Sequence, residues 1–193
     1  MDPGLRRDDG FVVRLLRFRF WNAHAPHPFP LIPRSPILIP RPIPRPSPMI
    51  SLLQRVTSAS VTVDRETVGA IDAGLLVLVG IEPGDGEPQA RRMCERLLGY
   101  RIFGDADGKM NLSLADTGGG LLLVPQFTLA ADTRKGMRPS FTTAAAPETG
   151  RRWFDRLVEL TRASHPRVAT GRFGAHMQVQ LVNDGPVSFI LRV

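Results

Sequence analysis

Apolar and polar residues alternate through much of the chain beyond residue 49, and this two-residue period predicts a strand-rich domain. The segments with this pattern are 49–58, 59–63, 68–71, 175–182 and 187–193. Two further runs, 75–81 and 121–128, are largely apolar throughout, as is typical of strands buried on both faces. Polar segments with Gly or Pro separate the strands, so we expect turns between them.

Two longer segments repeat their apolar residues every three or four positions, which predicts amphipathic helices at 88–102 and 147–164. The residues expected on their apolar faces are Ala90, Met93, Leu97, Trp153, Leu157 and Leu160. Strands before, between and after two helices predict a layered α/β domain. Its sheet should either curl into a barrel or divide into two packed sheets.

Residues 1–48 differ in composition from the rest of the chain and hold 11 of its 18 prolines. Proline cannot donate a backbone hydrogen bond, so this Pro- and Arg-rich extension is expected to be disordered and polyproline-like. Arg14, Arg17 and Arg19 interrupt its apolar stretch, unlike the apolar core of a secretory signal. The folded domain is therefore expected at 49–193, with Met49 as a candidate translation start. A Pro-rich recognition segment that recruits partners is the alternative.

Net charge gives little support to a nucleic-acid-binding surface on the domain. The chain carries +7, but residues 1–48 hold eight Arg and three Asp, a net +5. Residues 49–193 keep 17 basic and 15 acidic side chains, a net +2.

Cysteine usage and hydropathy favour a cytoplasmic protein without a membrane span. The single cysteine, Cys94, excludes an internal disulfide framework and fits a reducing compartment. Because it lies in the first predicted helix, we expect it to be a buried structural thiol. No apolar run approaches the roughly 18 residues that a membrane-spanning helix needs.

Standard catalytic motifs are absent from the sequence. There is no nucleophile elbow, zinc-protease helix, phosphate-binding loop or dinucleotide fingerprint. Beyond residue 48 the histidines are His165, expected to be solvated at a helix end, and His176, expected in a strand. Residues 105–109 resemble the start of a calcium loop, but Asp116 stands where such a loop ends in Glu, so we expect a turn. We therefore expect no metal or cofactor, and any catalysis should rely on backbone dipoles and groups of the substrate.

Three separated motifs give the domain a more specific signature. They are Met-Ile-Ser-Leu-Leu-Gln-Arg-Val at 49–56, Pro-Gln-Phe-Thr-Leu at 125–129 and Asn-Asp-Gly-Pro-Val-Ser at 183–188, with Gly-Arg-Phe-Gly-Ala-His-Met at 171–177. By these motifs and their spacing, residues 49–193 resemble the D-aminoacyl-tRNA deacylases. The resemblance implies a homodimer that hydrolyses the ester between a D-amino acid, or glycine, and the 3′ end of tRNA. It also implies rejection of the L-aminoacyl ester.

The resemblance also implies roles for individual residues. Gln126, Phe127 and Thr128 would line the aminoacyl pocket as its catalytic segment, with the backbone N–H groups of Phe127 and Thr128 on the scissile carbonyl oxygen. Gly185 and Pro186, joined by a cis bond, would reach into the partner subunit's pocket and exclude an L side chain. The remaining binding residues would be Asn183 in the same loop, Arg55 as its brace, and Phe173 and Met177 beside the adenosine.

Several alternatives stay open at this stage. Pro125 replaces the Ser of the family signature, and a related animal deacylase that acts on L-alanyl-tRNA shares this Pro, which would relax the chirality. A non-catalytic RNA-binding module is another reading. Thr128 could act as a nucleophile, but no base is evident, so a positioning role is favoured. The candidates for phosphate contact are Arg134, Lys135 and Arg138, or Arg151, Arg152 and Arg156.

Overall fold

The computed structural model describes residues 49–134 and 136–193, so the predictions made for residues 1–48 lie outside the described part. The strands of the main sheet are β1 (Ile50–Val63), β2 (Glu66–Ile71), β3 (Gly74–Gly80), β6 (Gly120–Pro125), β7 (Val168–Thr170) and β8 (Gln178–Arg192). A small hairpin pairs β4 (Phe103–Gly104) with β5 (Met110–Leu112). The helices are α1 (Glu87–Gly99), α2 (Leu114–Thr117), α3 (Pro147–Ser164) and the 3-10 helix η1 (Phe127–Ala130).

The main sheet has the strand order β2-β1-β3-β6-β7, and β8 pairs antiparallel with the other edge of β1. The pairs β3 with β6 and β6 with β7 are parallel. The sheet curls until β2 approaches β7, where the carbonyl oxygen of Thr170 would lie 2.5 Å from a Cβ on Gly69. The fold is thus a mixed α/β domain with a nearly closed, barrel-like sheet, which confirms the predicted fold class.

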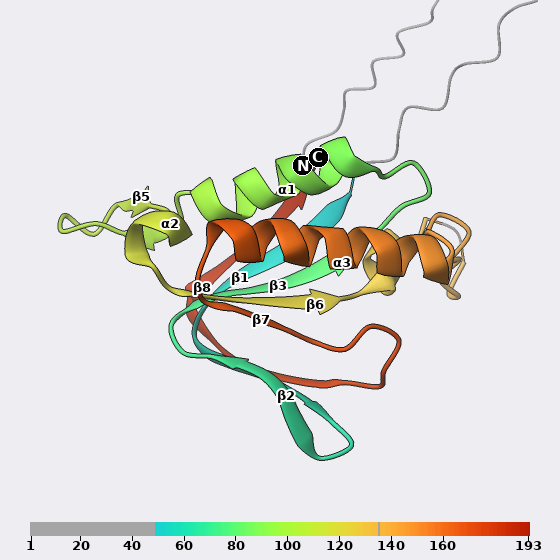
Figure 1. The fold of residues 1–193 in the computed structure, drawn as a ribbon, viewed down its shortest axis with the longest axis horizontal. Helices are drawn as coiled ribbons and strands as arrows, with labels where there is room; N and C mark the ends of the chain where they lie inside the picture. The colour runs from blue at the N-terminus through green and yellow to red at the C-terminus, as the bar shows by residue number, and fades with distance from the viewer. Residues whose placement is uncertain (1–48, 135) are drawn as a thin grey trace, which may run out of the picture. The chain divides into compact units, whose positions relative to one another are not determined.

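Side chains of the central strands point alternately to two hydrophobic clusters. Leu75, Val77 and Leu123 face the cluster that holds the buried residues of α1 and α3, and these helices cover this face of the sheet (Figure 1). Leu76 and Leu122 face the second cluster on the other side. Burial on both faces explains the continuous apolar runs in these two strands.

The predicted helices are confirmed, with small differences. α3 has the predicted bounds, and α1 begins and ends slightly earlier than predicted. Cys94 is buried in α1. In α3, Phe154 and Leu157 are buried, whereas Trp153 and Leu160 are partly exposed. No helix of residues 49–134 and 136–193 is long and apolar enough to cross a membrane.

Several short elements differ from the prediction. Segments 49–58 and 59–63 form one strand, β1, and segments 175–182 and 187–193 form one strand, β8, which begins at Gln178. The strand predicted at 121–128 ends at Pro125, where the chain turns into η1. The strands β4, β5 and β7 and the helix α2 were not predicted, so the described chain has three α-helices instead of two.

His165 is not solvated, contrary to the prediction. Its side chain is buried, and Nε2 lies 2.7 Å from the carbonyl oxygen of Gly119. The imidazole thereby joins the end of α3 to the start of β6. The position at a helix end suggested exposure to solvent, but tertiary packing buries the ring.

Candidate functional site

A cavity of about 430 Å³ opens at the carboxyl ends of β3 and β6. Val79 and Pro125 form its floor at the ends of the two strands. Gly150 and Phe154 of α3 form one wall, and the loop that leads into β8 forms another. The carboxyl ends of parallel strands are a common position for ligands, because the connecting loops diverge there.

The segment 126–128 turns sharply at the edge of this cavity. The backbone N–H of Gln126 donates to the carbonyl oxygen of Val79 at 2.7 Å, which fixes the turn to the end of β3. The first bond within η1 runs from the N–H of Leu129 to the carbonyl of Gln126 at 3.2 Å. The N–H groups of Phe127 and Thr128 precede that bond, and a helix leaves its first N–H groups without an intrahelical acceptor.

The side chain of Gln126 also fixes its own neighbour. Its Nε2 donates to the hydroxyl of Thr128. Gln126 and Phe127 line the cavity, whereas Thr128 is exposed and is not part of the lining. The Thr128 hydroxyl is therefore engaged as the acceptor of the Gln126 amide.

Phe173 and Met177 lie on the opposite wall, in the loop before β8. The Phe173 ring packs against Phe154 with its centroid 6.2 Å away, and the Arg151 guanidinium lies 4.9 Å from its centre. The Met177 sulfur accepts the N–H of Arg172 at 3.3 Å. These contacts hold two apolar side chains against the cavity. The structure thus brings together four predicted site residues from two distant segments: Gln126, Phe127, Phe173 and Met177.

The other predicted site residues form a second group on β8 and β1. Asn183 pairs with Val56 and Ser188 with Gln54, so the four residues 184–187 lie opposite Arg55 alone. We call this bulge, residues 184–187, the β8 loop. Its Gly185-Pro186 peptide bond is cis.

The β8 loop is held from both sides by side chains. Asn183 accepts the N–H of Val187 at 2.8 Å and donates to the Ser188 hydroxyl at 3.1 Å. Arg55 contacts Asp184 through Nε, 3.2 Å from the carbonyl oxygen and 2.9 Å from Oδ2 of the carboxylate. Its Nη1 donates to the carbonyl of Ile102 at 2.7 Å, so Arg55 ties the loop to the segment before β4.

The two groups lie at opposite ends of the same strands. Arg55 pairs with Leu75 at the start of β3, and the cavity begins at Val79, four residues further along. At about 3.3 Å per residue this separation is roughly 13 Å along the strand. Within one subunit, therefore, the β8 loop does not reach the cavity.

His176 also lines the cavity and was missed as a site residue. It is exposed in the loop before β8, not in a strand as predicted. Among the described residues that line the cavity, His176 has the side chain suited to general acid–base chemistry. A single histidine in a Gly-rich segment carries no sequence signal that separates a cavity residue from a surface residue.

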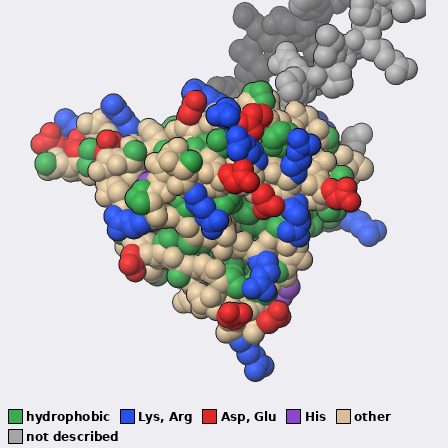
Figure 2. All heavy atoms as spheres, in the orientation of Figure 1, with side chains coloured by type: hydrophobic (Ala, Val, Ile, Leu, Met, Phe, Trp, Pro, Cys, Tyr) green, Lys and Arg blue, Asp and Glu red, His purple; other side chains and the backbone are tan. Residues whose placement is uncertain are grey.

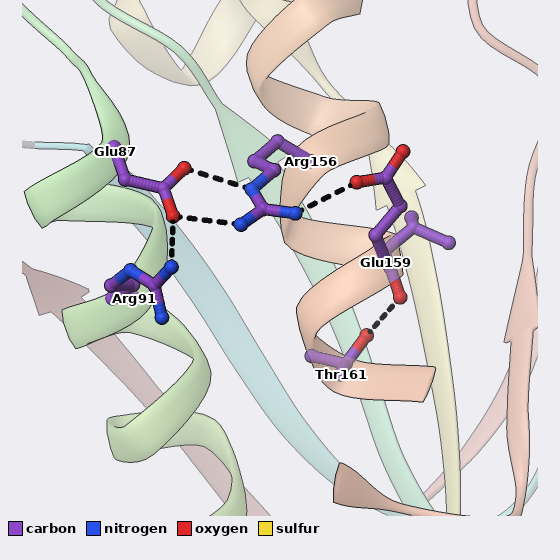
Figure 3. Close-up of polar contacts among 6 residues, drawn as sticks. Glu87, Arg91, Arg156, Glu159 and Thr161 are labelled. Atoms are coloured by element: carbon purple, nitrogen blue, oxygen red, sulfur yellow. Dashed lines mark hydrogen bonds and ion pairs between the residues drawn. The ribbon is translucent and has the colours of Figure 1, made fainter. Parts of the chain in front are cut away.

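The basic side chains proposed for phosphate contact are largely engaged with neighbours. Arg156 forms ion pairs with Glu87 of α1 and with Glu159, at 2.8 and 2.9 Å (Figure 3). The guanidinium hydrogen bond lowers the pKa of Glu87, and its carboxylate raises that of Arg156. Arg134 pairs with Asp132 at 2.7 Å and lowers the pKa of that carboxyl. Figure 2 shows acidic and basic side chains intermixed over α1 and α3, without a large patch of one sign.

Within residues 49–134 and 136–193 no group of three or more His, Cys, Asp or Glu side chains could hold a metal ion. Residues 105–109 form the predicted turn, in which Asp105 Oδ1 accepts the N–H groups of Asp107 and Lys109.

Comparisons with known proteins identify the family of the chain. A family model described as D-Tyr-tRNA(Tyr) deacylase matches residues 52–192. A D-aminoacyl-tRNA deacylase of Methylococcus capsulatus is 72% identical over 144 residues, which cover 75% of this chain and 94% of that protein. The D-aminoacyl-tRNA deacylase of Stenotrophomonas maltophilia is 70% identical over 145 residues, which cover 75% of this chain and 99% of that protein.

Solved structures share the fold. One described as the c-Myc DNA unwinding element binding protein has a TM-score of 0.71 and 37% identity, covering 74% of this chain and 97% of that one. A probable eukaryotic D-amino acid tRNA deacylase has a TM-score of 0.67 at 18% identity, covering 75% of this chain and 99% of that one, and shows the fold alone. By sequence and fold the chain is a member of an enzyme family. That family is the D-Tyr-tRNA(Tyr) deacylases, to which this chain belongs.

Proposed function

We propose that this protein is a D-aminoacyl-tRNA deacylase. It hydrolyses the ester between a D-amino acid and the 3′ end of tRNA, and it releases free tRNA and the D-amino acid; glycyl-tRNA is a second substrate. The observation that carries this proposal is the turn at 126–128, whose first helical N–H groups lie at the edge of an apolar cavity. Family membership supports the same activity.

The chemistry proposed for this site uses the backbone. The terminal adenosine lies against Phe173 and Met177, and the N–H groups of Phe127 and Thr128 donate to the ester carbonyl oxygen. Water attacks the carbonyl carbon, the bond to the ribose oxygen breaks, and that oxygen takes a proton. The neighbouring ribose hydroxyl assists the water. A preorganised donor of this kind lowers the barrier by about 3–4 kcal/mol, because the oxygen becomes negative as the water adds.

Thr128 has a positioning role in this proposal. Its hydroxyl already accepts a hydrogen bond from Gln126, and this contact supports a rigid turn. A nucleophilic threonine would instead need a base within hydrogen-bond distance. The hydroxyl therefore aligns the two N–H donors and does not attack the ester.

Chirality is proposed to be read by the β8 loop of a second subunit in a homodimer. The loop lies roughly 13 Å from the cavity of its own subunit, so a neighbouring copy must supply it if it acts there. Its backbone occupies the position toward which an L side chain would project, and Arg55 and Asn183 hold it in place. Glycine has no side chain to exclude, so its ester is cleaved. The protein is proposed to act in the cytoplasm on aminoacylated tRNA, without contact to a membrane.

Deacylation of D-Tyr-tRNA, L-Tyr-tRNA and Gly-tRNA tests the proposal. We expect release of D-Tyr and Gly at rates well above the spontaneous rate, and L-Tyr-tRNA should remain intact. Inactivity on all three esters, with or without tRNA binding, would contradict a deacylase. Efficient cleavage of L-Tyr-tRNA or L-Ala-tRNA would instead support the relaxed chirality suggested by Pro125.

A further inference from the structure

Two exposed phenylalanines stand together at the edge of the cavity. Phe127 is 59% exposed and Phe141 is 44% exposed, and their ring centres are 5.2 Å apart at an angle of 55°. Phe127 also lines the cavity, so the pair continues the apolar surface outward from it. A contiguous exposed apolar surface beside a cavity indicates a binding site, because removing apolar surface from water lowers the free energy.

Phe141 is held in place by the backbone on both sides of it. Asp132 and Ser140 exchange hydrogen bonds of 2.8 and 3.0 Å, which close the loop before Phe141. After it, the N–H of Ala145 donates to the carbonyl oxygen of Ile81 at 3.0 Å, at the end of β3. These hydrogen bonds therefore anchor the chain on both sides of Phe141.

We propose that the Phe127 and Phe141 rings receive the base of the nucleotide that precedes the terminal adenosine of the substrate. The inference rests on the proposed function. With the terminal adenosine in the cavity, the Phe127 and Phe141 rings stand at the cavity edge and offer the next nucleotide an apolar surface. Phenyl rings stack on any base. Arg138, exposed on the same loop, adds a positive charge suited to the phosphate between the two nucleotides.

The test compares two substrates of different length across three variants. Phe141→Ala should lower kcat/KM for D-Tyr-tRNA by roughly tenfold or more, since loss of one stacked base weakens binding by that order. Hydrolysis of D-tyrosyl-adenosine, which ends at the terminal nucleoside, should be unchanged. Phe141→Trp should restore the rate on tRNA. Met137→Ala, on the same loop and fully exposed, is the control and should leave both rates unchanged.

Each other outcome overturns the inference. An equal loss on both substrates would place Phe141 in the aminoacyl pocket, and no loss on tRNA would leave the rings without this role. A change in sedimentation of Phe141→Ala would show that the rings contact a second copy of the chain instead. Failure of the wild-type protein to cleave either substrate would refute the proposed function itself and is thus distinguishable.

A second, independent observation concerns a buried carboxylate. Asp85 and Glu82 are 6% and 9% exposed. Oδ2 of Asp85 accepts the N–H of Glu82 at 2.7 Å, but Oδ1 is buried without a hydrogen-bond partner among the described residues. Burial raises the pKa of Asp85 to about 7, and the nearby charge of Glu82 also raises it. Nη1 of Arg192 lies 4.0 Å from Oε1 of Glu82.

Met49 lies directly beside this carboxylate. Its side chain is fully buried, and its carbonyl oxygen accepts the N–H of Val193 at 3.2 Å. Its backbone N–H lowers the pKa of Asp85, against the larger opposing effect of burial. We also infer that Asp85 is the ion-pair partner of the α-ammonium group of Met49 when translation begins there. An ammonium group supplies a full positive charge and further N–H donors, which a buried unpaired carboxylate needs.

Thermal unfolding of residues 1–193 and of residues 49–193, which hold every described element, tests this second inference. In the longer chain the pKa of Asp85 is raised on folding, so its folded state binds the proton more tightly than the unfolded state does. Stability from this group is then present near pH 4 and falls as the pH rises toward 7. With the α-ammonium group as partner, the shorter chain should not lose stability over this range.

Asp85→Asn gives the second readout. We expect it to lower the Tm of residues 49–193 by roughly 5 °C at pH 7 and to leave that of residues 1–193 unchanged or higher. Identical pH profiles of the two chains would overturn the inference. An equal effect of Asp85→Asn in both would do the same.

Discussion

At the scale of single residues, Gly185 is the position where a side chain meets the strongest obstacle in the β8 loop. Its φ of +132° is one that L side chains rarely adopt, and a Cβ there would lie 2.6 Å from Val187 Cγ2. Gly185→Ala should destabilise the loop by about 1–3 kcal/mol. We expect at least tenfold slower cleavage of D-Tyr-tRNA and measurable cleavage of L-Tyr-tRNA.

Gly104→Ala is the matched control for that variant, because a Cβ on Gly104 meets no atom within 4 Å. Its rates on both esters should equal those of the wild type. Retention of full discrimination by Gly185→Ala would show that the backbone of this loop does not read chirality.

A substitution of His176 distinguishes catalysis by backbone donors from catalysis by a side chain. Because the proposed chemistry uses backbone donors, His176→Gln should keep kcat/KM within about threefold of the wild type. Its pH–rate profile between pH 5 and 9 should be unchanged. A loss of more than about 100-fold, of the size that general acid–base groups supply, would make His176 the catalytic base.

The loss of rate in Thr128→Ala distinguishes a positioning role of Thr128 from a nucleophilic one. Thr128→Ala removes the acceptor of the Gln126 amide, and the misaligned turn should slow D-Tyr-tRNA hydrolysis by about 10–100-fold. A nucleophile would lose its activity down to the level left by binding alone, about 10⁴-fold or more. Thr128→Ser keeps a hydroxyl and should recover most of the rate under the positioning role.

The sequence predicted the site residues only where a motif marked them. Gln126, Phe127, Phe173 and Met177 were placed by resemblance, and the structure brings them to one cavity. His176 and Phe141 could not be predicted, because their positions depend on how two loops meet at the ends of β3 and β6. No local periodicity or residue spacing predicts how these loops pack.

At the scale of elements, prediction depended on length and periodicity. α3 shows several turns of apolar repeat, and its bounds agree with the prediction. α2 spans four residues and is defined by reciprocal capping between Ser113 and Asp116, which is too short for a periodic signal. β8 was divided at Gly185 and Pro186, yet its pairing with β1 continues on both sides of the loop. Tertiary pairing here overrides the local breaking residues.

Arg156 of α3 forms an ion pair with Glu87 of α1 across the two helices (Figure 3). Arg156→Gln should lower the Tm, and the difference should shrink in 1 M NaCl. The pKa of Glu87 is lowered on folding, so its stabilisation is present at neutral pH and is lost as the pH falls below about 4.

Arg92→Gln is the control for this comparison, since Arg92 pairs with Glu95 within α1 alone. It should change the Tm less than Arg156→Gln does. Equal shifts for the two variants would mean that the inter-helix ion pair adds nothing beyond a surface charge.

At the scale of the whole molecule, one subunit carries the cavity and the β8 loop at opposite ends of β3, roughly 13 Å apart. Two defective variants can therefore complement each other if sites form between subunits. Thr128→Ala damages the cavity and Gly185→Ala damages the loop, so each homodimer should be slow. After subunit exchange about half of the dimers are mixed, and each mixed dimer has one intact cavity facing one intact loop.

The mixture should regain about a quarter of the wild-type rate on D-Tyr-tRNA. If each subunit instead used its own loop, no mixed dimer would contain an intact site. The rate of the mixture would then equal the mean of the rates of the two variants, and the proposed exchange of loops between subunits would be wrong.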